Sequence, residues 1–340
     1  GAYDDMIDSS VRLTTGHVQI VAPGYHDRPE MRKVISDPDR LILASAQLGN
    51  VENVATRSEA FGLASGDKRS RGLAVTGVEP AVELEFSSVP RQIVEGRYLR
   101  QGDGSVAVIG GLAARHLQLG IGDECVVLGS GRDGSIAAGV VSIVGIIRTG
   151  IDEFDRAAMQ LPLTEFDSIF SMDGAVHRLI YIFDQLSDSG PAADRLKADK
   201  AASGLRVMTW EELTPGLKQS IELDLISGII MYFILVVVVA FSIVNTFFMA
   251  IFERKKEFGV LMSIGMKPGR LVRLMLLESL SMTWVGLVLG ILTGVAVTLV
   301  VSRYGISMGD SAEFMAQYGM PERLYPKLTP LSIVVGPLLI

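Results

Sequence analysis

Cysteine and histidine, which supply most reactive thiols and transition-metal ligands, are scarce in this sequence. Cys125 is the only cysteine in 340 residues, so the chain forms no internal disulfide and has no Cys/His spacing suited to zinc. We interpret Cys125 as a small apolar core residue. The four histidines are widely scattered, which is typical of structural roles: His17, His26, His116 and His177. No metal site is therefore expected.

Several enzyme motifs are also missing. There is no GxxxxGK[ST], so no phosphate-binding P-loop is expected, and the glycine-rich residues 129–134 indicate a hairpin turn. HExxH is absent as well. Asp152, Glu153 and Asp155 form an acidic cluster that could hold a cation, although a solvated turn is the favoured interpretation. The sequence thus predicts a chain that is not an enzyme and holds no cofactor itself.

A basic surface for nucleic acid is lacking too, because the net charge is −7 at pH 7. The charge is concentrated in residues 1–224, and the rest is mostly apolar. Residues 225–252 and 279–302 contain no Asp, Glu, Lys, Arg or His, and each run exceeds the ~20 residues with which a helix crosses a bilayer. Residues 331–340 look like the start of a third, truncated span. A lipid bilayer is therefore an expected partner.

The connection between the two complete spans predicts their orientation. It is rich in cations, which mark the cytoplasmic side of a membrane: Arg254, Lys255, Lys256, Lys267, Arg270 and Arg273. We therefore expect residues 253–278 in the cytoplasm, and residues 1–224 and 303–330 outside it. The chain would be a multi-pass protein of the cytoplasmic (inner) membrane, and a further span is expected before Gly1.

Residues 1–214 are expected to form a large α+β extracytoplasmic domain beside an α-helical transmembrane bundle. Strand-like runs occur at residues 18–21, 73–78, 106–109, 126–128, 140–147 and 179–183. Helical patterns occur at residues 39–48, 112–119, 163–170 and 192–203. Short strands and tight turns over about residues 100–160 predict a β-rich subdomain inserted into the other subdomain.

The first span continues a helix that begins outside the apolar run. Thr214 and Pro215 are typical of a helix start, and no breaker follows before Phe252. A single helix over residues 215–252 would be about 57 Å long at 1.5 Å per residue. Because the hydrocarbon core is only ~30 Å thick, part of this helix is expected to stand above the bilayer as a stalk.

Small and polar residues within the spans predict contacts between helices. Gly286, Gly290 and Gly294 recur every four residues and form a stripe along which another helix can approach closely. Asn245 and Thr246 could bind substrate, but bonding to a neighbouring helix or to their own backbone is favoured. We assign all five residues to transmembrane packing.

Residues 253–266 predict a short amphipathic helix with a charged start, which Gly265 and Pro268 end. A basic helix resting on anionic lipid is one explanation. Glu253 and Glu257 among the cations favour a protein partner instead, because opposite charges on one surface select a matching surface.

Residues 243–294 resemble the FtsX-like permease family, on the motif IVNTFFMAIFERKKEFGVLMSIGMKPGRLVRLMLLESL. The residues at matching positions are Asn245, Thr246, Glu253, Arg254, Glu257, Gly259, Gly265 and Glu278. TGHVQI and TWEELTPGL in the preceding domain are similar to lipoprotein-releasing (LolC/LolE-type) permeases and, less closely, to macrolide-efflux (MacB-type) permeases.

The resemblance implies a permease subunit of an ABC transporter. Two permeases, identical or homologous, would pair above ABC ATPase subunits, which bind ATP and Mg and drive movement in the extracytoplasmic domains. It implies extraction or export of lipoproteins or lipid-like substrates, with a periplasmic acceptor or adaptor as a possible partner. The alternatives are peptide or drug efflux, and a signalling scaffold acting on cell-wall hydrolases. The ATPase-coupling residues would be Glu253, Arg254, Glu257, Phe258, Gly259, Leu261 and Gly265.

Overall fold

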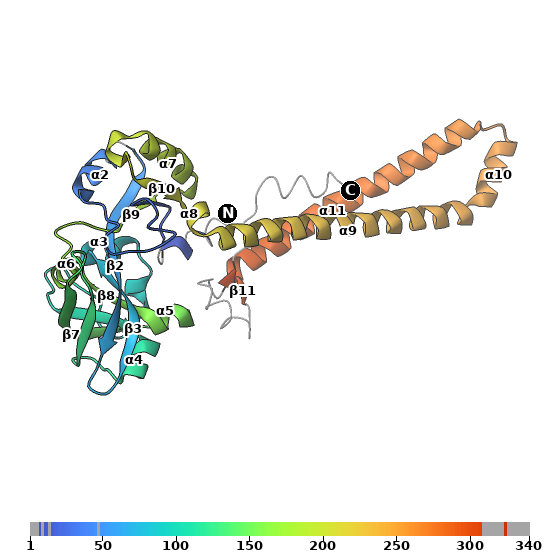
Figure 1. Ribbon diagram of the computed structural model, residues 1–340. Coiled ribbons are helices and arrows are strands. Elements are labelled where there is room, and N and C mark those ends of the chain that lie inside the picture. The colour runs from blue at the N-terminus through green and yellow to red at the C-terminus, as the bar shows by residue number, and fades with distance from the viewer. Residues whose placement is uncertain (1–6, 8–9, 13–14, 46–47, 308–322, 325–340) are drawn as a thin grey trace. The chain divides into compact units, whose positions relative to one another are not determined.

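The computed structural model describes residues 7, 10–12, 15–45, 48–307 and 323–324 (Figure 1). They fall into two compact units. An α/β unit lies within residues 3–217, and a helical unit comprises residues 218–307 with 323–324. The predicted loop at 303–330 lies mostly outside the described residues, and the predicted third span at 331–340 lies wholly outside them.

A ten-stranded mixed sheet organises the α/β unit, in the order β10-β1-β9-β2-β3-β8-β5-β7-β4, with β6 paired to both β2 and β7. The strands are β1 Val18–Val21, β2 Val51–Ser65, β3 Ser70–Val78, β4 Ile93–Gly96, β5 Val106–Gly110, β6 Glu124–Ser130, β7 Ile136–Ile147, β8 Ala158–Pro162, β9 Arg178–Phe183 and β10 Arg206–Thr209. The helices are α2 Pro38–Ser45, α3 Pro80–Phe86, α4 Gly111–Leu117, α5 Asp152–Ala157, α6 Leu163–Phe170, α7 Ser189–Ala198 and α8 Trp210–Leu213.

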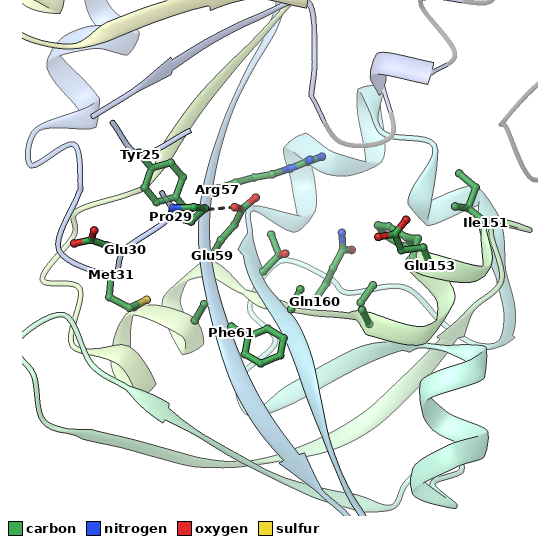
Figure 2. Close-up of a pocket in the computed structure, with 16 residues that line it drawn as sticks. Tyr25, Pro29, Glu30, Met31, Arg57, Glu59, Phe61, Ile151, Glu153 and Gln160 are labelled. Atoms are coloured by element: carbon green, nitrogen blue, oxygen red, sulfur yellow. Dashed lines mark hydrogen bonds between the residues drawn. The ribbon is translucent and has the colours of Figure 1, made fainter. Parts of the chain in front are cut away.

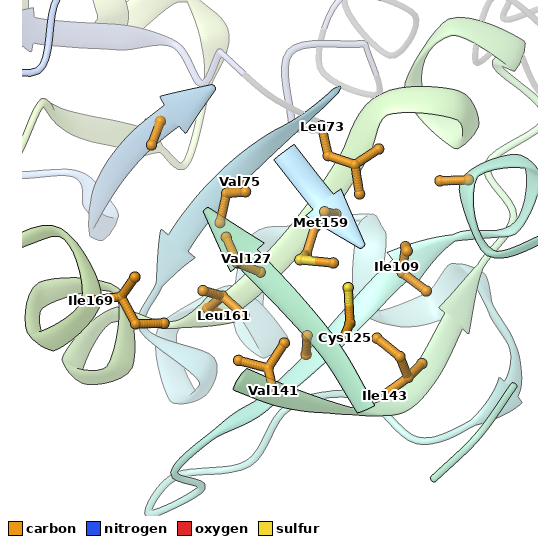
Figure 3. Packing of buried hydrophobic residues seen from close by; sticks show 14 of the residues in the cluster. Leu73, Val75, Ile109, Cys125, Val127, Val141, Ile143, Met159, Leu161 and Ile169 are labelled. Carbon is orange, nitrogen blue, oxygen red and sulfur yellow. The ribbon is translucent and has the colours of Figure 1, made fainter. Parts of the chain in front are cut away.

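Six of these strands close into a barrel. β2 pairs with β3, the ladder continues through β8, β5 and β7 to β6, and β6 pairs back with β2. Alternate residues point inward, so that Leu73, Val75 and Met159 fill the interior with apolar side chains (Figure 3). Cys125 is buried in this core, where desolvation raises the pKa of its thiol. The thiol is therefore an unreactive packing group.

A second lobe shares strand β2 with the barrel. Residues 51–57 of β2 pair with β9, whereas residues 57–65 pair with β3. Strands β1, β9 and β10 form this lobe with α2 and α7, around a core that includes Val18, Tyr181 and Leu196. The inserted subdomain expected at about residues 100–160 is thus too short, because the barrel also needs β2 and β3 from earlier in the chain.

A buried ion pair lies where β2 passes between the lobes. Arg57 Nε and Nη2 donate to the two carboxylate oxygens of Glu83 over 2.6 and 2.9 Å. The two side chains are 5% and 0% exposed. Both charges are buried, so their mutual attraction and hydrogen bonds offset the cost of taking them out of solvent.

His177 has a structural role near the same part of β2, where it joins that strand to the segment after β1. Its Nδ1 accepts the Glu59 backbone N–H over 3.0 Å, so Nε2 carries the proton and donates to the Met31 carbonyl over 3.3 Å. The ring stacks on Tyr25, with 5.0 Å between centroids. Burial lowers the pKa of His177 to about 4, because the charged imidazole loses its hydration.

The helical unit contains α9 Pro215–Glu253, α10 Lys255–Ser263 and α11 Pro268–Tyr304. Its short strands β11 Ile306–Ser307 and β12 Arg323–Leu324 pair with each other. Helices α9 and α11, of 39 and 37 residues, are long and apolar enough to cross a membrane. At 1.5 Å per residue α9 is about 58 Å long. It has no buried side chain, and Leu271 is the only buried one in α11. A complete transmembrane bundle is not formed by the residues described.

Candidate functional site

We call the connection between α9 and α11, residues 254–267, the elbow. Within the helical unit the chain reverses direction here, and α10 forms the turn (Figure 1). Arg254 is the single residue between α9 and α10, and its backbone leaves helical geometry at φ −96° and ψ 10°. One non-helical residue therefore redirects the chain.

Arg254 binds two carboxylates and braces the elbow. Its Nε donates to Glu257 Oε2 in α10 over 3.0 Å. Its Nη1 donates to both carboxylate oxygens of Glu278 in α11, over 2.8 and 2.9 Å. The guanidinium also lies 5.9 Å from the ring centroid of Phe258. One side chain thus links the end of α9 to both following helices.

Gly265 ends α10 by taking a backbone conformation that side-chain-bearing residues rarely adopt, with φ at +102°. The Gly265 N–H donates to the Met262 carbonyl over 3.0 Å, and the Met266 N–H donates to the Leu261 carbonyl over 3.1 Å. This pair of bonds is the Schellman helix ending. Pro268 then begins α11, so the length of α10 is set at both ends.

The outward surface of α10 is apolar as well as charged. Val260, Met262 and Ile264 are 58%, 48% and 79% exposed, whereas Phe258 and Leu261 are half-buried. Val260 and the C-cap residue Ile264 are four residues apart and share one side of the helix end, where they make an apolar surface suited to contact with another molecule. Of the remaining predicted coupling residues, Glu253 and Gly259 are exposed.

The structure changes the argument for Glu257. Among the predicted coupling residues, this carboxylate suggested a partner protein by its charge, yet it already binds Arg254. Its charge is thus satisfied within the chain, and the exposed aliphatic surface is the stronger indication of a partner. Glu278 was recognised as a motif residue but not as a site residue. A carboxylate at the start of an apolar span was the one feature of the sequence that could have marked Glu278 as a site residue.

The residues assigned to transmembrane packing contact little within the chain. The Thr246 hydroxyl donates to the Ser242 carbonyl one turn earlier over 2.9 Å, which is one of the two kinds of bonding favoured from sequence, and Asn245 is exposed in α9. A Cβ atom added at Gly286, Gly290 or Gly294 would meet no described atom within 4 Å. The glycine stripe is therefore open to a helix other than α9.

The acidic cluster separates into three different environments. Asp155 is buried and accepts bonds from the Thr149 N–H and hydroxyl, both over 2.9 Å. Asp152 binds Arg156 over 3.0 Å, and Glu153 lines a cavity. Among the described residues no group of three or more His, Cys, Asp or Glu side chains could hold a metal ion.

Comparison with known proteins confirms the FtsX-like resemblance for the helical part of the chain. Residues 229–340 match the FtsX-like permease C-terminal family. The lipoprotein-releasing system transmembrane protein LolC of Neisseria meningitidis is 20% identical over 233 residues, covering 66% of this chain and 56% of LolC. The ABC transporter permease YknZ of Bacillus subtilis is 27% identical over 203 residues, covering 58% of this chain and 46% of YknZ. This chain therefore spans about half the length of each relative.

Two solved structures are similar to the chain at low identity. The periplasmic region of MacB from Actinobacillus actinomycetemcomitans is 14% identical, with a TM-score of 0.45, and the match covers 64% of this chain and 98% of that one. The extracellular domain of YknZ from Gram-positive bacteria is 12% identical, with a TM-score of 0.41, and the match covers 57% and 99%.

Proposed function

We propose that this chain, whose residues 229–340 match the FtsX-like permease C-terminal family, is a permease subunit of an ABC transporter. The observation that carries the proposal is the braced elbow between two apolar helices. Arg254 ties the end of α9 to α10 and α11, so a force on α10 acts on both long helices at once. A partner ATPase, which binds ATP and Mg, supplies that force.

The proposed arrangement places the elbow in the cytoplasm, on the basis of its cations, and the α/β unit on the extracytoplasmic side of the inner membrane. Helix α9 then carries movement from the elbow toward the α/β unit. The exposed aliphatic side chains of α10 contact the ATPase. A second permease, identical or homologous, covers the open glycine stripe of α11.

Lipoproteins or lipid-like molecules are the proposed substrates. The support is the set of LolC relatives, whose name describes a lipoprotein-releasing system. Depletion of the chain should leave palmitate-labelled lipoproteins in the inner membrane of the cells that express it. Normal lipoprotein release together with altered drug or peptide sensitivity would favour efflux instead.

Two matched substitutions test ATPase docking. Ile264→Asp places a charge at the exposed C-cap of α10, and Ile136→Asp makes the same change at an exposed position of the barrel, where Ile136 is 86% exposed. Full-length chain is purified from native membranes, and a co-purifying subunit with a P-loop is identified by mass spectrometry and by ATP hydrolysis. We expect Ile264→Asp to lose most of this subunit and Ile136→Asp to keep it. Equal recovery with both variants would remove α10 from the docking surface.

A further inference from the structure

A large hollow lies on the outer wall of the barrel in the α/β unit (Figure 2). Its volume is about 710 Å³, within the roughly 300–1,000 Å³ typical of small-molecule sites. Its floor comes from the β2–β3 hairpin and from β8, which lies about 80 residues further along the chain, so no local pattern in the sequence indicates it. We call this hollow the trough.

Strand register explains the floor of the trough. Cross-strand partners share one face of a sheet, and Glu59 of β2 pairs with Thr76 of β3, which pairs with Gln160 of β8. The next row on this face is Phe61, Ala74 and Ala158. All six residues line the trough. A polar row therefore runs beside an apolar row, and the two alanines leave the space above them empty.

The walls add apolar and aromatic surface. One wall is the segment after β1, with Tyr25, Pro29 and Met31, and the other is the region of α5, with Ile151 and Phe154. Most of the lining is thus apolar, while Phe61 stands 78% exposed at the rim. Such a surface suits the hydrocarbon or aromatic part of a ligand.

The charges of the trough favour a cation. Arg57 is already bound to Glu83, Glu59 binds Arg178 over 2.7 Å, and Glu30 binds Lys33 over 3.2 Å. Glu153 lines the trough and has no ion pair among the described residues. Aromatic faces also attract cations. The one uncompensated charge that the trough offers is therefore negative.

We propose that the trough is a binding site for a small organic cation. Its ammonium group would lie at Glu153, and its apolar body would lie over Ala74 and Ala158. Phe61 and Phe154 bound the apolar body. This proposal rests on the α/β unit alone, so it stands or falls separately from the permease function.

Three probes of equal shape test the charge preference: 4-phenylbutylammonium, 4-phenylbutanol and 4-phenylbutyrate. Full-length chain in lipid nanodiscs carries ¹³C-methyl methionine, and the Met31 signal is assigned by its loss in Met31→Leu. We expect saturable shifts of Met31, with the ammonium binding roughly 3- to 10-fold more tightly than the alcohol and the carboxylate most weakly. Met231, Met249 and Met282 on the apolar helices report any partition into lipid instead.

Substitutions locate the site. Glu153→Gln should abolish the preference for the ammonium over the alcohol while leaving the affinity for the alcohol unchanged. Asp152→Asn removes the same charge one residue away, outside the trough, and should change neither affinity. Ala74→Leu fills the space from an exposed position and should abolish binding of all three probes. The proposal is overturned if Met31 shows no saturable shift, if the three probes bind equally, if Asp152→Asn acts like Glu153→Gln, or if Ala74→Leu still binds.

Discussion

The two units of this chain use apolar residues in opposite ways. The barrel and the second lobe bury theirs, and the ion pair between Arg57 and Glu83 is enclosed with them. Helices α9 and α11 expose theirs, with one buried side chain between them. The α/β unit therefore contains the interactions that stabilise it, whereas the helices need lipid and other helices to cover their surface.

Of the changes considered, breaking the buried ion pair should lower the stability of the α/β unit the most while leaving the helices unaffected. Glu83→Gln removes the carboxylate that binds the buried Arg57 guanidinium, and breaking such a buried pair typically costs about 3–5 kcal/mol of unfolding free energy. We expect the α/β unit to melt about 10 °C lower, with α9 and α11 still inserted in the membrane. Fluorescence of Trp210 in a Trp284→Phe background follows the α/β unit alone.

The matched control is a partly exposed ion pair in the same unit. Arg12 binds Glu52 over 2.8 Å, with Glu52 34% exposed. Glu52→Gln should cost less than about 1 kcal/mol. Equal melting shifts for the two variants would mean that enclosure of the Arg57 pair contributes nothing.

A proline in α9 should affect the helical unit and spare the α/β unit. Ile221→Pro removes a backbone hydrogen bond and adds a steric clash, at about 3 kcal/mol or more. Electron paramagnetic resonance distances between spin labels at positions 218 and 235 should broaden, while the melting temperature reported by Trp210 stays unchanged. Transport should fall more than ATP hydrolysis. Intact transport with a demonstrably broken helix would exclude α9 as the transmitting element.

Acid should weaken the α/β unit through His177. The folded pKa of His177 is about 4, below the ordinary value of about 6.5, so the unfolded chain binds a proton first as pH falls. The resulting stability is complete above pH 6.5 and is lost between pH 6.5 and 4, by about 3 kcal/mol. His177→Asn keeps a hydrogen-bond acceptor and should flatten this part of the pH profile. An unchanged slope in His177→Asn would contradict the assignment.

Substitution in the glycine stripe should have the smallest effect on the stability of the chain itself. A Cβ atom added at Gly290 meets no described atom within 4 Å outside its own helix backbone, so we expect Gly290→Leu not to destabilise the isolated chain through a clash. Association with a second permease should weaken, because leucine keeps the two helices apart. Crosslinking in membranes measures the association, with Val288→Leu on the same helix as control. Normal crosslinking of Gly290→Leu would leave the stripe without a packing role.

Local sequence patterns were sufficient to predict the helices and strands whose apolar residues recur at a regular helical or strand spacing. Residues 18–21 and 163–170 became β1 and α6 at the expected bounds, and the helix expected at 215–252 is observed as α9, one residue longer. Strand β2 was missed because it pairs with β9 in one half and with β3 in the other, and its residues 55–58 are buried one after another. Its first half therefore shows no clean alternation.

Contacts between distant residues were beyond the sequence. Nothing in the spacing of Glu59, Thr76 and Gln160 indicates that they lie side by side, because strand register is set by the closed barrel. The same holds for Arg254 and Glu278, which are 24 residues apart. The short helix predicted within residues 253–266 is observed as α10, whereas the ion pair that joins Arg254 to Glu278 of α11 could be found only in the structure.

Sidedness is the most direct test of the proposed account, since α9 can transmit movement only if the elbow and the α/β unit lie on opposite sides of the membrane. The measurement uses single cysteines at Lys267 and at Gln101 in a Cys125→Ala background, with a membrane-impermeant maleimide. We predict labelling of the Gln101 position in cells whose inner membrane is intact, and labelling of the Lys267 position only after that membrane is opened. Labelling at Lys267 from outside the intact membrane would contradict the account.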